Sequence, residues 1–86
     1  MYDKHIIFGV HITERLKNAV QVQACLTEYG NCIKTRLGLH ELEKGDSPNG
    51  LLVLEMAGDE KRINQFAKKV GQIEGVELQK MIFDHP

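Results

Sequence analysis

The chain has 86 residues and a mass of 9.7 kDa, which suits one small domain, because a domain usually needs about 50 residues or more. Eleven Lys and Arg residues against twelve Asp and Glu residues give a formal net charge of −1. This balance lacks the positive field of proteins that neutralise many phosphates, so it disfavours direct nucleic-acid binding, and the length excludes a two-lobed enzyme.

Neither the N-terminal segment nor the cysteines point to export or to a membrane. The apolar run that follows Lys4 is broken at His11 and Thr13, which makes it too short for a signal peptide or a membrane span. Cys25 and Cys32 stand seven positions apart, a spacing that matches neither a CxxC redox pair nor a zinc knuckle. We therefore expect a cytoplasmic protein with free thiols and no membrane contact.

The first half of the chain predicts a strand, a helix and a second strand. Residues 5–12 alternate between two faces, which is typical of a strand. Thr13 can cap a helix that Gly30 and Asn31 would end, and residues 32–40 alternate again as a second strand. The side chains expected to face the core are Ile6, Phe8, Val10 and Ile12 from the first strand, Leu16, Ala19, Val20, Val22, Leu26 and Tyr29 from the helix, and Ile33, Thr35, Leu37 and Leu39 from the second strand.

The second half repeats this order after a polar segment. Turn-forming residues fill positions 41–50, which predicts a long hairpin loop. Residues 51–57 form a nearly continuous apolar run, as expected of a strand with a neighbour on each side. Gly58 and Asp59 open a second helix, Gly75 ends it, residues 76–83 predict the last strand, and residues 84–86 form a frayed tail.

The order strand, helix, strand, strand, helix, strand consists of two similar βαβ halves. Right-handed crossovers place the third strand beside the first, and the fourth on the other side of the first. We therefore predict a single domain over residues 1–86 with an α+β, ferredoxin-like βαββαβ fold. Its four antiparallel strands carry two helices on one side of the sheet.

The side of the sheet that the helices leave uncovered carries more apolar side chains than a solvated surface should. By strand parity this side holds Ile7, Gly9, His11, Arg36, Gly38, His40, Val53, Glu55, Met81 and Phe83. Monomers seldom leave such an apolar patch open to water. We therefore predict a homodimer or homotetramer of closed symmetry whose interface contains Ile7, Val53, Met81 and Phe83.

The same side is expected to hold a binding site for a small-molecule effector or a protein partner. An arginine offers five donors for a carboxylate or phosphate, a glycine lets a ligand approach the backbone, and a histidine titrates near neutral pH. The alternative is that the glycines mark bulges, that Arg36 pairs with Glu55, and that this side is only a subunit seam. The residues expected in the binding site are Arg36, Gly38, His40, Gly9 and His11.

We expect no bound metal, no cofactor and no catalytic residue. His11 and His40 would end strands at the same edge of the sheet, about 9 to 10 Å apart, which is wide for a shared ion without a third ligand such as Glu41. They are nevertheless the candidate ligands of an alternative function, a nickel or zinc sensor that also uses Cys32. The chain has no phosphate loop, nucleophile elbow or zinc-protease motif, and its third strand has no aromatic residue on which RNA bases would stack.

Several segments recur together, in the same order, in a known family. They are Arg36-Leu37-Gly38-Leu39-His40-Glu41, the polar loop, the apolar third strand, and Val70-Gly71-Gln72-Ile73-Glu74-Gly75-Val76. With these segments the chain resembles the iron-only hydrogenase system regulator family over nearly its whole length. The resemblance implies a short, stand-alone ACT-like domain that is akin in fold to the C-terminal sensor domain of nickel-responsive repressors and that has a regulatory role.

The chain departs from the nickel-sensing relatives because it has no His-x-His pair. It also has no helix-turn-helix or basic arm, so any effect on transcription would pass through a partner. We therefore predict a non-catalytic regulatory domain that self-associates and binds a small effector. The two alternatives are the metal sensor and a small enzyme of unknown reaction.

Overall fold

The computed structural model describes residues 3–13, 15–39 and 49–85. The elements follow the predicted order: β1 (Asp3–Ile12), α1 (Arg15–Glu28), a 3-10 turn (Gly30–Cys32), β2 (Ile33–Leu39), β3 (Gly50–Met56), α2 (Glu60–Gly71) and β4 (Val76–His85). Strands β1 and β4 are each two residues longer at one end than the alternation predicts. Most of the loop expected at 41–50 lies outside the described residues.

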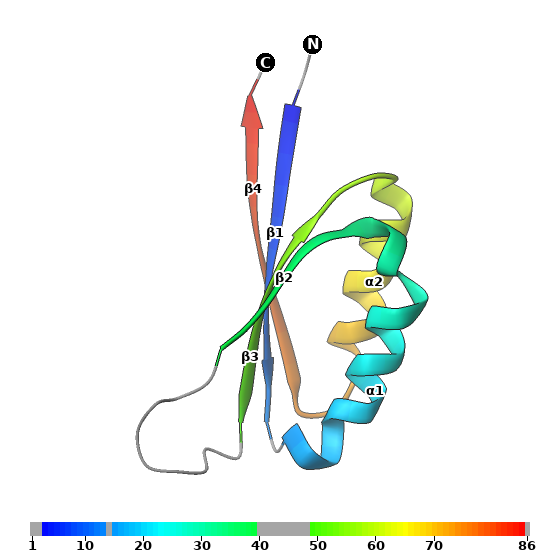
Figure 1. Cartoon of the computed structure of the whole chain (residues 1–86), viewed down its shortest axis with the longest axis vertical. Helices are drawn as coiled ribbons and strands as arrows, with labels where there is room; N and C mark the ends of the chain where they lie inside the picture. Colours follow the sequence, from blue (N-terminus) through cyan, green and yellow to red (C-terminus); the bar gives the residue numbers. More distant parts are fainter. Residues whose placement is uncertain (1–2, 14, 40–48, 86) are drawn as a thin grey trace.

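The four strands form one antiparallel sheet in the order β2-β3-β1-β4, and both helices lie on the same side of it (Figure 1). β3 and β1 are therefore the central strands, and β2 and β4 form the two edges of the sheet. This arrangement confirms the ferredoxin-like βαββαβ prediction.

The core lies between the helices and the sheet. The Phe8 ring from β1 stacks on Phe66 from α2 with 6.1 Å between centroids, and Tyr29 meets Phe66 edge-on at 5.7 Å. The Arg62 guanidinium covers the outer face of the Tyr29 ring at 4.7 Å, which closes this end of the core. The predicted inward set of β1 is confirmed, since all four of its residues, Ile6, Phe8, Val10 and Ile12, are buried. On α2 the buried side chains are Ile63, Phe66 and Val70.

The apolar stripe expected on α1 is wrong in part. Val20 is 75% exposed, whereas Asn18 is buried and its Nδ2 donates to the Thr13 carbonyl oxygen at 2.6 Å. Val20 stands two residues from both Asn18 and Val22, so it lies about 200° around the helix from each, on the far side. Ala19 is also exposed, and the buried side chains in the described part of α1 are Asn18, Val22 and Leu26, followed by Tyr29 just beyond the helix. The side chain of Leu16, also expected in the stripe, lies outside the described part of the structure.

A bulge in β2 overturns the predicted facing of that strand. Ile33 pairs with Met56, and Thr35 pairs with Glu55, the neighbour of Met56 on β3. β2 therefore has one extra residue, Lys34, at this point. Beyond the bulge every side chain is on the opposite side from the one that unbroken alternation predicts. Leu37 is consequently 53% exposed on the side away from the helices, and the prediction that it faces the core is wrong.

Both cysteines are free, as expected, with Cys25 half-buried and Cys32 buried. Burial raises the pKa of the Cys25 thiol, and the positive charge of Lys69 opposes that rise. Neither helix among the described residues is long and apolar enough to cross a membrane.

Candidate functional site

The side of the sheet away from the helices, which we call the open face, carries a row of exposed apolar side chains. By the strand register it holds His5, Ile7, Gly9 and His11 of β1, Thr35 and Leu37 of β2, Leu51, Val53 and Glu55 of β3, and Glu77, Gln79, Met81 and Phe83 of β4. Met81 is 54% exposed and Phe83 is 48% exposed. The structure thus places the four predicted interface residues on this face, and adds Leu37 and Leu51 to them.

Gly9 leaves a depression in the middle of the open face. A Cβ atom built at Gly9 would have no neighbour within 4 Å. Two adjoining hollows meet there: one of about 280 Å³ beside Val53 and Met81, and one of about 340 Å³ beside His11 and Glu77. His11 and Gly9 therefore belong to the same surface as the apolar row.

The charge of Glu55 on the open face is met by its neighbours on β1 and β2. Its carboxylate accepts a hydrogen bond from the Thr35 hydroxyl at 3.2 Å, and its other oxygen lies 3.7 Å from His5 Nδ1 and 3.8 Å from Lys34 Nζ. The pair between Arg36 and Glu55 that the alternative reading required is not formed, because the bulge puts the two side chains on opposite sides of the sheet.

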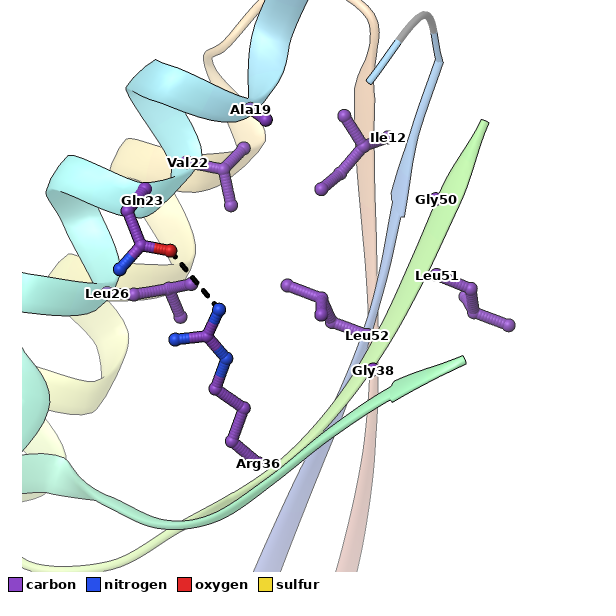
Figure 2. A pocket seen from close by; sticks show the side chains of 10 residues that line it. All are labelled: Ile12, Ala19, Val22, Gln23, Leu26, Arg36, Gly38, Gly50, Leu51 and Leu52. Carbon is purple, nitrogen blue, oxygen red and sulfur yellow. Dashed lines mark hydrogen bonds between the residues drawn. The ribbon is translucent and has the colours of Figure 1, made fainter. Parts of the chain in front are cut away.

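A third hollow, which we call the α1 groove, lies on the helix side of the sheet and has a volume of about 150 Å³. It opens where α1 meets the ends of β2 and β3 (Figure 2). Its lining residues are Ile12, Ala19, Val22, Gln23, Leu26, Arg36, Gly38, Gly50, Leu51 and Leu52.

Arg36 reaches from β2 across this groove toward α1 (Figure 2). Its Nη2 donates a hydrogen bond to Gln23 Oε1 at 3.1 Å, at a position open to solvent. Gly38 lies two residues further along the same side of β2, opposite Leu52. A Cβ at Gly38 would lie 3.5 Å from Leu52 Cδ2, so the absence of a side chain at Gly38 leaves more space in this part of the groove.

The five residues predicted to share one binding site are thus divided by the structure. Arg36 and Gly38 line the α1 groove, whereas Gly9 and His11 lie on the open face, on the other side of the sheet. The prediction that Arg36 and Gly38 belong to the open face is wrong. The cause is the extra residue in β2, which also made the prediction for Leu37 wrong. His40 lies outside the described residues.

The sequence analysis missed the part of the groove that α1 provides. Gln23 is exposed and polar, and nothing in its local pattern distinguishes it from an ordinary solvated position. The signal that could have found it is its place one residue after core-facing Val22, on the flank of the helix next to β2. Within the described ranges, no group of three or more His, Cys, Asp or Glu residues is placed to hold a metal ion.

A family model matches this sequence over residues 4–80: the TM1266-like family, which carries the description of an iron-only hydrogenase system regulator. The chain belongs to this family. The match covers both helices, β2, β3, β1 from Lys4 onward and β4 as far as Lys80, so it includes the α1 groove and most of the open face but not Met81 or Phe83.

Solved structures with the same fold are also found. The structure of the uncharacterized protein TM1266 from Thermotoga maritima is 24% identical, with a TM-score of 0.79, over 94% of this chain and 99% of that chain. CPII from Thiomonas intermedia K12, bound to ADP, AMP and acetate, is 8% identical with a TM-score of 0.54, over 100% of this chain and 92% of that one. A second structure of CPII, a nitrogen regulatory PII-like protein, bound to ADP, AMP and bicarbonate, is 10% identical with a TM-score of 0.53, over 96% and 91%. No curated protein matches the sequence.

Proposed function

We propose that this chain is a non-catalytic regulatory module that works as an assembly of identical copies joined through the open face and that binds a small-molecule effector. The regulatory part is supported by the family, whose description is that of a hydrogenase system regulator. Fold analogy with CPII, a nitrogen regulatory PII-like protein, points the same way.

The observation that carries the assembly is the shape of the open face. Met81 and Phe83 stand out from β4, while Gly9 leaves a depression on the neighbouring strand. A second copy of the chain, related by a twofold axis, can place its own projecting side chains in that depression. The open face therefore has both projecting side chains and a depression, as an interface between two identical surfaces requires.

A small chain also gains from such an interface. A domain of this length buries only about 60% of the surface of its unfolded chain, so its own core gives limited stability. Covering exposed apolar side chains contributes about 25 cal/mol for each Å² removed from water. Gly9 and His11 take part in this interface in our proposal, while the effector site is the α1 groove with Arg36 and Gly38.

We place the module in the cytoplasm. Two free cysteines, one half-buried and one buried, suit a reducing compartment.

Sedimentation of matched variants tests the assembly. Met81→Asp puts a charge on the open face at a side chain that is 54% exposed, so we expect a folded monomer where the wild-type chain is a dimer or larger. Val53→Asp, at the centre of the same face, should also dissociate the assembly. Val20→Asp is the control, because Val20 is an equally apolar and more exposed side chain on the far side of α1.

A wild-type chain that sediments as a monomer at micromolar concentration contradicts the proposal. The same holds if Val20→Asp dissociates the assembly and Met81→Asp does not, because the interface would then lie on the helices.

A further inference from the structure

The α1 groove has the size and lining of a site for a compact apolar group. Ile12, Val22, Leu26 and Leu52 line it from β1, α1 and β3. Its volume is about 150 Å³. An apolar cavity of about 150 Å³ stays dry and accepts benzene, which has six non-hydrogen atoms. The groove therefore has room for an apolar group of about that size and is too small for a nucleotide.

Arg36 places a positive charge at the mouth of this apolar groove. Among the described residues that line the groove, it is the only charged one. Among the described residues it donates to a neutral amide, Gln23, and forms no ion pair. A guanidinium has five N–H donors arranged to match a carboxylate, so one bond to an amide leaves most of its capacity unused.

The single charge of Arg36 favours a carboxylate over a phosphate as the bound anion. A phosphate group carries close to two negative charges at neutral pH and is usually met by several donors or cations. A carboxylate carries one negative charge, which one arginine can balance with two parallel hydrogen bonds. One arginine beside an apolar hollow thus fits a monocarboxylate better than a phosphate.

We propose that the α1 groove binds a small monocarboxylic acid, with its carboxylate on Arg36 and an apolar group of about six non-hydrogen atoms in the hollow. This inference rests on the proposed function only in naming the effector; the site itself lies within one chain. Gln23 holds the guanidinium at the mouth of the groove until the carboxylate arrives.

Gly38 sets the depth of the site in this proposal. It has no positive φ angle, and a Cβ there would make an ordinary 3.5 Å contact with Leu52 Cδ2. Alanine is therefore compatible with the fold at this position, and its methyl group narrows the groove without removing the charge.

The experiment is an NMR titration of the full chain with two probe acids, 4-methylpentanoate and benzoate. The corresponding neutral amides, 4-methylpentanamide and benzamide, have nearly the same shape and lack the charge. With the acids we expect saturable shifts of the backbone N–H signals around the groove. The neutral amide probes should bind at least about tenfold more weakly than the acids, because hydrogen bonds to charged groups are stronger than those to neutral groups.

Three variants separate the parts of the site. Arg36→Gln should weaken binding of the acids about tenfold or more and leave the weak binding of the amides unchanged. Gly38→Ala should weaken acids and amides alike, because it takes space from both. Lys34→Gln is the matched control, since it removes one positive charge from the same strand at a residue outside the groove.

Four results would overturn the inference: no saturable binding of either acid, equal binding of acids and amides, equal loss in Lys34→Gln and Arg36→Gln, or shifts that map to the open face. Repeating the titration with Met81→Asp separates the two proposals. A monomeric variant that still binds the acids supports the groove whatever the state of assembly, and an assembled wild-type chain that binds neither acid overturns the groove alone.

Discussion

Gly75 combines two demands at one position. Its φ angle of 83° lies in the left-handed region, which favours glycine. A Cβ there would also lie 2.6 Å from Nδ2 of the buried Asn18, whose own hydrogen bond runs to the Thr13 carbonyl. The Gly75 carbonyl in turn accepts from the Thr13 amide at 2.7 Å. Gly75 thus connects three parts of the chain: the turn before β4, the end of β1 and the first turns of α1.

Gly75→Ala should therefore destabilise the chain by more than backbone strain alone. Gly58→Ala is the control, because Gly58 has a φ angle of 105° but no atom within 4 Å of a built Cβ. We expect Gly58→Ala to cost about 1–2 kcal/mol of unfolding free energy, and Gly75→Ala about 1–3 kcal/mol beyond that, because it also disturbs the bond of Asn18. Urea denaturation measures both. Equal losses in the two variants would mean that Asn18 moves aside freely.

Among the elements, β2 shows how one extra residue changes the chemistry of two surfaces. The bulge between Ile33 and Thr35 turns Leu37 to the open face and brings Arg36 and Gly38 under α1. Without the bulge the described lining of the groove would have no charged residue, and the open face would have an arginine in its apolar row. Both proposed surfaces depend on this register.

Leu37→Lys tests that register directly. With Leu37 exposed, we expect the unfolding free energy to change by no more than about 0.5 kcal/mol when the variant is made in the Met81→Asp background, so that assembly does not contribute. Leu54→Ala, on the fully buried side of β3, should cost about 2–5 kcal/mol in the same background. If Leu37→Lys costs as much as Leu54→Ala, Leu37 faces the core and the register is wrong.

The sequence predicts the elements well because their signals are local. Alternation in β1, the cap at Asp59 and the periodic Ile63, Phe66 and Val70 of α2 each depend on residues a few positions apart. The bulge has no such signal, because Lys34 is an ordinary strand residue and the extra position appears only when β2 pairs with β3. Every candidate-site residue on β1, β3 and β4 was placed on its correct side, and those on β2 beyond the bulge were not.

The α1 stripe fails for a related reason. Val20 fits an apolar pattern by type, and Asn18 does not, yet Asn18 is the buried one, and its side chain donates a hydrogen bond to the Thr13 carbonyl oxygen. That carbonyl belongs to a turn whose conformation depends on Gly75, more than fifty residues away. A pattern of hydrophobicity contains no information about such a partner.

At the scale of the molecule, the sheet separates two surfaces with different tasks. The α1 groove lies under a helix within one chain, and the open face looks outward from the other side. The proposed effector site is therefore built from residues of one chain, and of its lining only Leu51 also belongs to the described part of the open face.

Assembly should appear in the thermal stability of the wild-type chain. A partner that binds only the folded state raises the unfolding temperature as protein concentration rises. For a hundredfold increase in concentration we expect the Tm of the wild-type chain to rise by roughly 5 °C or more, as followed by circular dichroism. The Met81→Asp variant should show no such dependence. A wild-type Tm that stays constant over this range would contradict the assembly.

The position of β4 beside β1 has a consequence for how the chain is made. Every residue of β1 pairs with a residue more than sixty positions later in the sequence, from Asp3 with His85 to Ile12 with Val76. On a ribosome, β1 emerges well before β4, so one edge of this central strand has no neighbour until the chain as far as β4 has been synthesised. Contacts of such long sequence separation form slowly, and an open strand edge invites pairing with other chains. The nascent chain is therefore exposed to misassociation until residues 76–85 leave the exit tunnel, and this interval is when a chaperone would protect it.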